Sequence, residues 1–99
     1  MKEKKRYLQI KIIHAKKLPK EEAKHVLYEA IFSFIGENGA SKAMAQIKEF
    51  DEEKQIAIVK CRTEFLEEVI AALALKHAFQ SVPISFQLEK ISGNIGKVL

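Results

Sequence analysis

The chain has 99 residues, 47% apolar and 30% charged, which suits one small soluble domain without a membrane-spanning run of roughly 20 apolar residues. A single cysteine excludes an internal disulfide framework and a cysteine-rich zinc site, and the basic N-terminus lacks the apolar stretch of a signal peptide. The net charge of +4 divides into +7 over residues 1–20 and −3 over the other 79. This segregation favours a polyanionic partner, although lysine-rich ends are also common as solvated termini.

The first half of the chain predicts a strand followed by a long helix. Residues 6–14 alternate apolar and polar side chains, so Leu8, Ile10 and Ile12 are expected to face a core. Apolar residues at helical spacing follow Pro19, and Gly36 is a suitable end for that helix. A turn and a short helix are expected over residues 36–43.

The second half predicts a hairpin, a second helix and a last strand. Strands over 46–50 and 55–61 flank a polar loop, Thr63 can cap a helix over 64–78, and residues 82–89 alternate clearly. This order predicts an α+β, ferredoxin-like or RNA-recognition-motif-like sandwich. Two long helices would cover one face of a four-stranded antiparallel sheet, with the short helix beside them. We expect a single domain over residues 1–99, with a basic end at 1–5 and an irregular tail at 92–99.

The residues that could carry catalysis do not form a recognisable catalytic pattern. His14, His25 and His77 fall on different predicted segments without metal-ligand spacing, and His25 is expected at the surface. Cys61 alternates with apolar neighbours, which is typical of a small buried residue. The acidic cluster of Glu49, Asp51, Glu52 and Glu53 could in principle hold a hard cation, but a solvated turn is the simpler interpretation. We therefore expect neither a catalytic site nor a metal site.

The sheet face opposite the helices is expected to be open and to carry mixed side chains. Tyr7 is its one predicted aromatic residue, which is too few for base stacking in the usual manner of an RNA-recognition motif. The same face is expected to hold cations and isoleucines, namely Lys11, Lys60, Arg62, Ile13, Ile56 and Ile58. Such a face suits phosphate or protein contacts better than base readout.

Both long helices carry more apolar surface than one core face requires. On the first helix, Tyr28 and Phe32 lie outside the apolar stripe, and the second helix is apolar on all sides over residues 71–75. A wide core would explain this surplus, and so would a protein partner. The candidate partner interface consists of Tyr28, Phe32, Ala71, Ala74 and Leu75.

Five segments in order resemble the family of small ribonuclease P protein subunits that includes archaeal protein component 2. They are Arg6-Tyr7-Leu8, the run from Phe34 to Ala43, Ile58-Val59-Lys60-Cys61, the run from Ala71 to Leu75, and Ile91-Ser92-Gly93-Asn94-Ile95. Asn94 departs from the threonine that usually follows Ser-Gly in this family. The resemblance covers nearly the whole chain.

The resemblance implies an RNA-recognition-motif-like fold and a non-catalytic subunit of an RNA-based endoribonuclease that removes the 5′ leader from precursor tRNA. The catalyst would be the RNA, whose bound magnesium the protein does not hold, and no cofactor of the protein itself is implied. The implied partners are the ribonuclease P RNA, a larger barrel-shaped protein subunit and, indirectly, precursor tRNA; self-association is left open. The alternative is a ferredoxin-like module that binds a small ligand or oligomerises without RNA.

Under this resemblance the protein would stabilise the catalytic RNA by neutralising phosphates where strands crowd together. Hydrogen bonds from a hydroxyl and from backbone could add to the cationic contacts. The candidate RNA-binding residues are Lys4, Lys5, Arg6, Lys11, Lys16, Lys17, Lys60, Arg62, Ser92, Gly93 and Lys97.

Overall fold

The computed structural model describes residues 4–76, 78–79 and 82–98; the side chains of residues 34, 35, 37–43 and 79 lie outside this description. No helix within the described part is long and apolar enough to cross a membrane. The elements in chain order are β1 (Lys5–His14), α1 (Lys20–Ala43), β2 (Gln46–Asp51), β3 (Ile56–Arg62), the 3-10 turn η1 (Thr63–Phe65), α2 (Leu66–Leu75), β4 (Ala78–Phe79), β5 (Val82–Ser92) and the 3-10 turn η2 (Ile95–Lys97).

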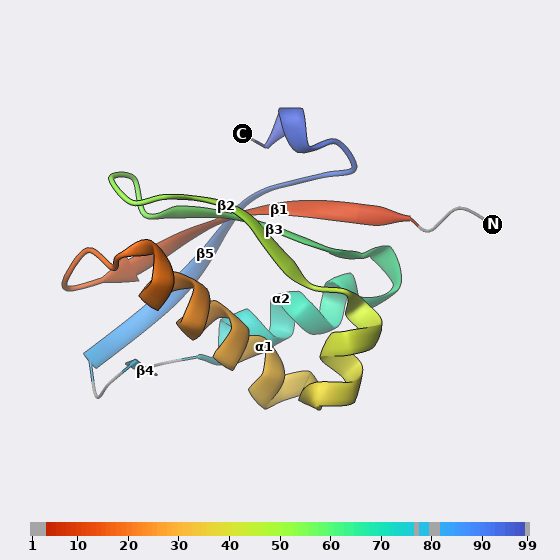
Figure 1. The fold of residues 1–99 in the computed structure, drawn as a ribbon, viewed down its shortest axis with the longest axis horizontal. Coiled ribbons are helices and arrows are strands. Elements are labelled where there is room, and N and C mark those ends of the chain that lie inside the picture. The colour runs from red at the N-terminus through yellow and green to blue at the C-terminus, as the bar shows by residue number, and fades with distance from the viewer. Residues whose placement is uncertain (1–3, 77, 80–81, 99) are drawn as a thin grey trace.

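The architecture is a helix layer on one face of an antiparallel sheet, as the sequence predicts (Figure 1). The strand order is β2-β3-β1-β5-β4, in which four strands are long and β4 has two residues. Both helices lie on the same side of the sheet, and the chain passes from β1 through α1 to β2 and from β3 through α2 to β5. The predicted α+β ferredoxin-like fold is therefore confirmed.

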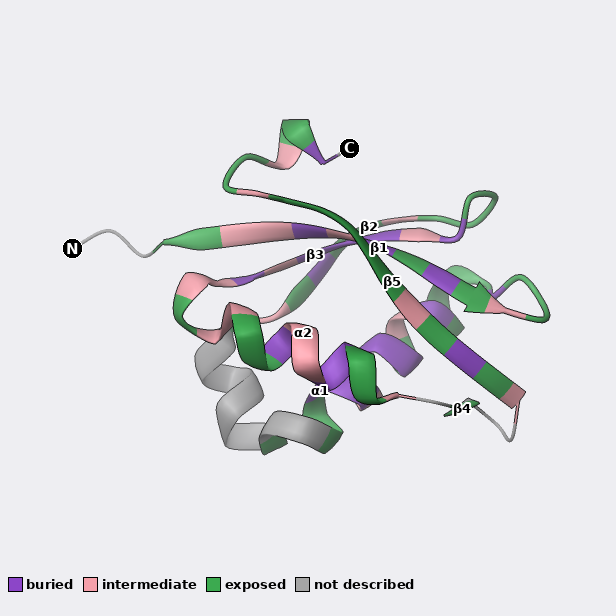
Figure 2. Cartoon of the chain, turned by 180° about the vertical axis from the view of Figure 1, so that it is seen from behind, coloured by how far each residue is buried: buried purple, intermediate pink, exposed green. Residues whose placement is uncertain are grey.

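The core lies between the sheet and the helices. Leu8, Ile10 and Ile12 of β1 are buried, as their alternation predicts, and pack with Leu27 and Ile31 of α1. Buried residues gather on the helix and strand surfaces that face each other, as Figure 2 shows. At about 25 cal/mol per Å² of apolar surface, this layer supplies most of the driving force for folding.

Three predicted helix boundaries differ from the structure or are refined by it. Gly36 has a φ of 74° and interrupts α1, so the short helix predicted after it is the continuation of α1 to Ala43. Thr63 begins η1, and its Oγ1 has no hydrogen-bond partner, so the predicted side-chain cap does not form; its backbone N–H donates to the Lys4 carbonyl at 2.9 Å. The second helix ends at Leu75 and not at residue 78, because Ala78 pairs in β4.

A β-bulge changes the faces of the last strand. Ile10 lies opposite Leu88 whereas Gln9 lies opposite Lys90, so Glu89 is the extra residue. The predicted alternation of β5 holds up to Leu88 and reverses after it. Consequently Lys90 shares the open face with Gln9, and Ile91 is opposite Leu8 on the helix side, where it is 43% exposed.

The C-terminal segment folds back over the open face of the sheet, on the side opposite the helices (Figure 1). The Gln9 side-chain Nε2 donates to the Val98 carbonyl at 2.6 Å, and Val98 is fully buried. Ile58 belongs to the open face by register but is only 3% exposed. The segment expected to be irregular thus contains an ordered 3-10 turn, which the Asn94 side chain caps by accepting from the Gly96 N–H.

A buried glutamine joins the β2–β3 hairpin to the loop before α1. The Gln55 side chain accepts from the Leu18 N–H at 2.9 Å and donates to the Leu18 carbonyl at 3.1 Å and to the Glu52 carbonyl at 2.6 Å. Its backbone carbonyl accepts from the Ile12 N–H at 2.8 Å. Gln55 also has a φ of 57°, an uncommon conformation for a side chain of this type, so its place in the hairpin is held by these bonds.

Candidate nucleic-acid interface

Strand register gathers most of the predicted RNA contacts at one end of the sheet. Lys5 of β1 lies opposite Arg62 of β3, and Tyr7 lies opposite Lys60. Directly opposed side chains on one face are about 5 Å apart at their Cβ atoms, so these cations form a cluster. Together with Lys4 and Lys90 they are called the cationic end below.

The turn after β5 closes the same end from the other side. Ser92 lies opposite Tyr7 in the ladder, and its hydroxyl accepts from the Asn94 N–H at 3.1 Å. A side chain at Gly93 would put its Cβ only 3.2 Å from Nη1 of Arg6, so glycine permits the close approach. By alternation, Arg6 belongs to the same face of β1 as the core residues, and its Nη1 donates to the Lys5 carbonyl at 2.9 Å. Ser92, Gly93 and Arg6 therefore border the cationic end.

The remaining predicted cations are not part of this cluster. Lys11 is on the open face six residues further along β1, about 20 Å away at the rise of an extended strand, and Lys16 and Lys17 follow beyond the end of β1. Lys97 lies in η2, exposed. The candidate RNA-binding cations are therefore divided between the cationic end and positions outside it, namely Lys11, Lys16, Lys17 and Lys97.

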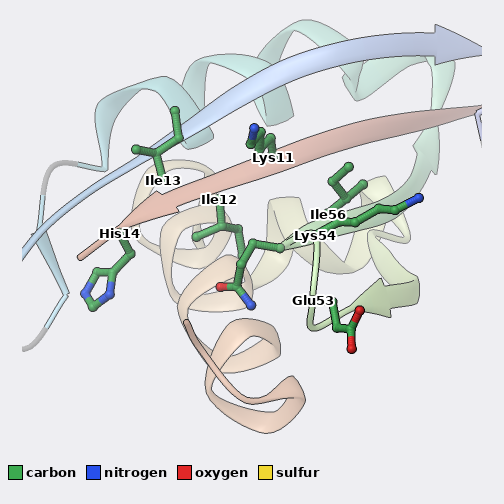
Figure 3. A pocket seen from close by; sticks show the side chains of 8 residues that line it. Lys11, Ile12, Ile13, His14, Glu53, Lys54 and Ile56 are labelled. Atoms are coloured by element: carbon green, nitrogen blue, oxygen red, sulfur yellow. The ribbon is translucent and has the colours of Figure 1, made fainter. Parts of the chain in front are cut away.

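The far end of the open face has mixed charge. A cavity of about 740 Å³ there is lined by Lys11, Ile13, Lys54 and Ile56, with Glu53 at the same hairpin (Figure 3). The Asp51 side chain accepts from the N–H groups of Glu53 and Lys54 at 3.0 and 3.1 Å, so the acidic loop is an exposed, self-capped turn. Among the described residues, no three His, Cys, Asp or Glu side chains are grouped as metal ligands would be.

An ion pair joins the two helices at their outer surface. Lys76 pairs with Glu29, and the hydrogen bond from Lys76 is the main cause that holds the pKa of Glu29 below its usual range. His25 is exposed, as expected, and its Nε2 lies 3.4 Å from the Glu29 carboxylate. The Glu29 side chain is 41% exposed and that of Lys76 is 18% exposed, so solvent screens the pair only in part.

Cys61 is a core residue, as the alternation predicts. It is 1% exposed, and desolvation raises the pKa of its thiol to about 11. A thiol with this pKa contains little of the reactive thiolate at neutral pH.

We therefore expect Cys61 to react slowly with iodoacetamide in the folded protein. At pH 8 the lower thiolate fraction alone should slow alkylation by about 100-fold relative to the urea-unfolded chain, and burial should slow it further. Mass spectrometry of timed samples measures both rates. Similar rates in the two states would contradict the buried position.

The predicted partner-binding residues occupy two sides of the helix layer. Tyr28 is half-buried and its hydroxyl accepts from the Ile47 N–H at 3.2 Å, which places it on the β2 side of α1. Phe32 is 43% exposed and its ring centroid is 6.3 Å from that of Tyr28. By contrast, Leu75 is exposed and lines a cavity of about 220 Å³ between α1 and α2 with Ser33 and other residues, while Ala71 is half-buried and Ala74 exposed.

Sequence reasoning did not identify the roles of two residues, Lys90 and Gln55. Lys90 belongs to the cationic end only because of the bulge at Glu89, and strict alternation from Ile84 would have turned it toward the helices. Gln55 looked like an ordinary first residue of a strand. The signal for the bulge at Glu89 was weak: the charged pair Glu89-Lys90 interrupts the apolar alternation of the strand. Gln55 had no local signal that would predict its buried role.

The comparisons with known proteins agree on one family. A sequence model of the Rpp14/Pop5 family matches residues 6–99. The chain is 29% identical over 98 residues to "Ribonuclease P protein component 2" of Pyrococcus furiosus, covering 99% of this chain and 82% of that protein. The protein of the same name from Thermococcus gammatolerans is 31% identical over 98 residues, with coverages of 99% and 82%.

A further relative of the same name and one solved structure extend the comparison. The Methanocaldococcus jannaschii protein is 29% identical over 97 residues, covering 98% of this chain and 71% of that one. A chain in the cryo-EM structure of yeast ribonuclease MRP superposes with a TM-score of 0.74 at 10% identity, covering 96% of this chain and 78% of that chain. At that identity the superposition shows a shared fold.

Proposed function

The chain belongs to the Rpp14/Pop5 family, and on that premise we propose that it is a protein subunit of ribonuclease P that does not itself catalyse cleavage. In this proposal it binds and stabilises the catalytic RNA that removes the 5′ leader from precursor tRNA, in the cytoplasm. Magnesium is held by the RNA, and the protein contacts precursor tRNA only through that RNA.

The observation that carries RNA binding is the cationic end. Lys5, Lys60 and Lys90 lie on three adjacent strands and on one face, because the register and the bulge place them there. Cations held on rigid strands can meet phosphates of a folded RNA without the entropic cost of ordering a flexible tail. Such contacts position the RNA independently of its sequence, which suits a subunit that stabilises a fold.

The exposed apolar residues of the helix layer support a protein partner. In the proposal the larger barrel-shaped subunit of ribonuclease P docks on the helices, whose surface lies on the side of the sheet opposite the C-terminal turn. Phe32 is the candidate anchor, because a partly exposed aromatic ring beside a second ring offers a large rigid contact.

Reconstitution tests the proposed function. We expect the protein, added with the larger subunit to ribonuclease P RNA, to lower the magnesium concentration at which precursor tRNA is cleaved. The readout is single-turnover cleavage across a magnesium titration, with and without this chain. If the chain neither binds that RNA nor shifts the titration, the proposal fails and the RNA-independent ferredoxin-like module is favoured.

For Phe32 we expect docking and folding to respond differently. Because the ring is 43% exposed, Phe32→Ala should cost about 1–2 kcal/mol of folding stability, less than the roughly 3–5 kcal/mol of a fully buried phenylalanine. Association with the larger subunit should weaken by about 1–3 kcal/mol. Thermal melts and calorimetric titration measure the two effects, and Ile13→Ala, a similarly exposed apolar residue outside the helix layer, is the matched control. Unchanged association would exclude Phe32 as an anchor.

A further inference from the structure

The protein's own C-terminal turn occupies the middle of the open sheet face. Val98 is fully buried there, the Gln9 amide donates to its carbonyl, and Ile58 beneath is 3% exposed. RNA-recognition motifs use aromatic residues on the two central strands of this face to stack bases. Here the Gln9–Ile58 rung of β1 and β3 is covered, and the next rung on the same face is Tyr7 with Lys60.

One rung from this covered position, Tyr7 lies among the cations of the cationic end. It is half-buried and lies on the open face of the central strand β1, opposite Lys60 on one neighbouring strand and opposite Ser92 on the other. Lys5 is its neighbour two residues earlier on the same face, and Lys90 is diagonal to it on β5. By register, Phe50 and Phe86 pair with core-facing Ala57 and Ile12, so Tyr7 is the one aromatic residue on this face among the described residues of the long strands.

The strand spacing sets the cations on both sides of the ring. Lys60 belongs to β3 and Lys90 to β5, so two strand spacings, about 10 Å, separate their backbones across Tyr7. Arg62 is diagonal to Tyr7 and pairs with Glu64. An aromatic ring between cations is the arrangement that binds single-stranded nucleic acid, where the base stacks and the phosphates meet the charges.

We propose that Tyr7 is the stacking residue of a single-nucleotide site, in which one unpaired base of RNA lies on its ring and the flanking phosphates lie against Lys5, Lys60 and Lys90. This inference rests on the proposed function and adds a contact to a base where the cations alone would contact only the backbone. Every base has a π face, so the site has little preference for base identity. Stacking on the ring requires a base that is free to leave its helix, so the site distinguishes unpaired from paired nucleotides.

The experiment separates ring stacking from charge. Ribonuclease P RNA is titrated with the wild-type protein and with Tyr7→Leu, Tyr7→Phe and the control Ile13→Ala, which is on the same face of β1 at the far end. Tyr7→Leu should weaken binding by about 5- to 100-fold because the ring is lost, with the salt dependence of binding unchanged because no charge is removed. Tyr7→Phe should bind within about two-fold of wild type, since it keeps the ring. Ile13→Ala should bind as wild type does.

A second measurement uses the wild-type protein, so it does not depend on whether a variant folds. RNA carrying 4-thiouridine is irradiated in the complex, and mass spectrometry locates the cross-linked peptide. A cross-link at Tyr7 supports the site. Cross-links confined to other residues, or a Tyr7→Leu variant that melts cooperatively and binds as wild type does, would overturn it while leaving the proposed function intact. If the wild-type protein does not bind the RNA, the proposed function itself fails.

Discussion

Replacing Lys5, Lys60 and Lys90 together with alanine is expected to make RNA binding markedly less sensitive to salt. Each lysine that meets a phosphate releases counterions, so its removal should reduce the slope of log affinity against log salt by about one unit, and the triple change by about three. Affinity should fall for every RNA sequence alike. Filter binding or fluorescence anisotropy between 50 and 300 mM salt, roughly the range in which such slopes are measured, gives the slope directly.

The matched control removes the same charge from cations outside the cationic end. Lys11→Ala, Lys16→Ala and Lys17→Ala together change the net charge equally, but these residues lie at and beyond the far end of β1. We expect this control to retain most of the salt dependence. Equal losses in both variants would mean that RNA senses only the total charge, and an unchanged slope in the first would show that the cationic end is merely solvated.

Gln55→Leu is expected to produce the largest loss of folding stability among the substitutions considered. The leucine fills a similar volume but leaves the Leu18 N–H and carbonyl without their partner, and Leu18 is itself buried. Each unsatisfied buried group costs about 1–3 kcal/mol, so the two groups predict a total loss of about 2–6 kcal/mol. At about 4–8 °C per kcal/mol for a domain of this size, the melting temperature should fall by roughly 10 °C or more.

Three further variants identify the cause of that loss. Lys54→Ala changes an exposed neighbour in the same hairpin and should shift the melting temperature by only a few degrees. Gln55→Gly also removes the amide but accepts the φ of 57° without strain, so it should be less damaging than Gln55→Ala. A melting temperature of Gln55→Leu close to that of the wild type would show that the amide bonds to Leu18 contribute little.

The local pattern of apolar and polar residues was sufficient to predict the main strands and helices of this protein and the layers that they form. The alternation of Leu8, Ile10 and Ile12 and the helical spacing after Pro19 report which side of each segment is apolar, and burial of those sides defines the layers. Gly36 could be identified as a break because glycine adopts a positive φ without cost. The buried position of Cys61 followed from the same alternation.

The sites required contacts between segments that are far apart in the sequence. The bulge at Glu89 turns Lys90 to the open face, and it depends on how β5 pairs with β1, which no local pattern specifies. Likewise, Val98 covers Ile58 because of a bond to Gln9, a residue 89 positions earlier. The sequence by itself determined the fold class, the core and the sign of the charge, since these depend on local periodicity and composition. Only the tertiary structure decided which cations share a surface and how much of the sheet remains open. The reason is that strand register, and the folding of the C-terminal segment back over the sheet, depend on contacts between residues far apart in the sequence.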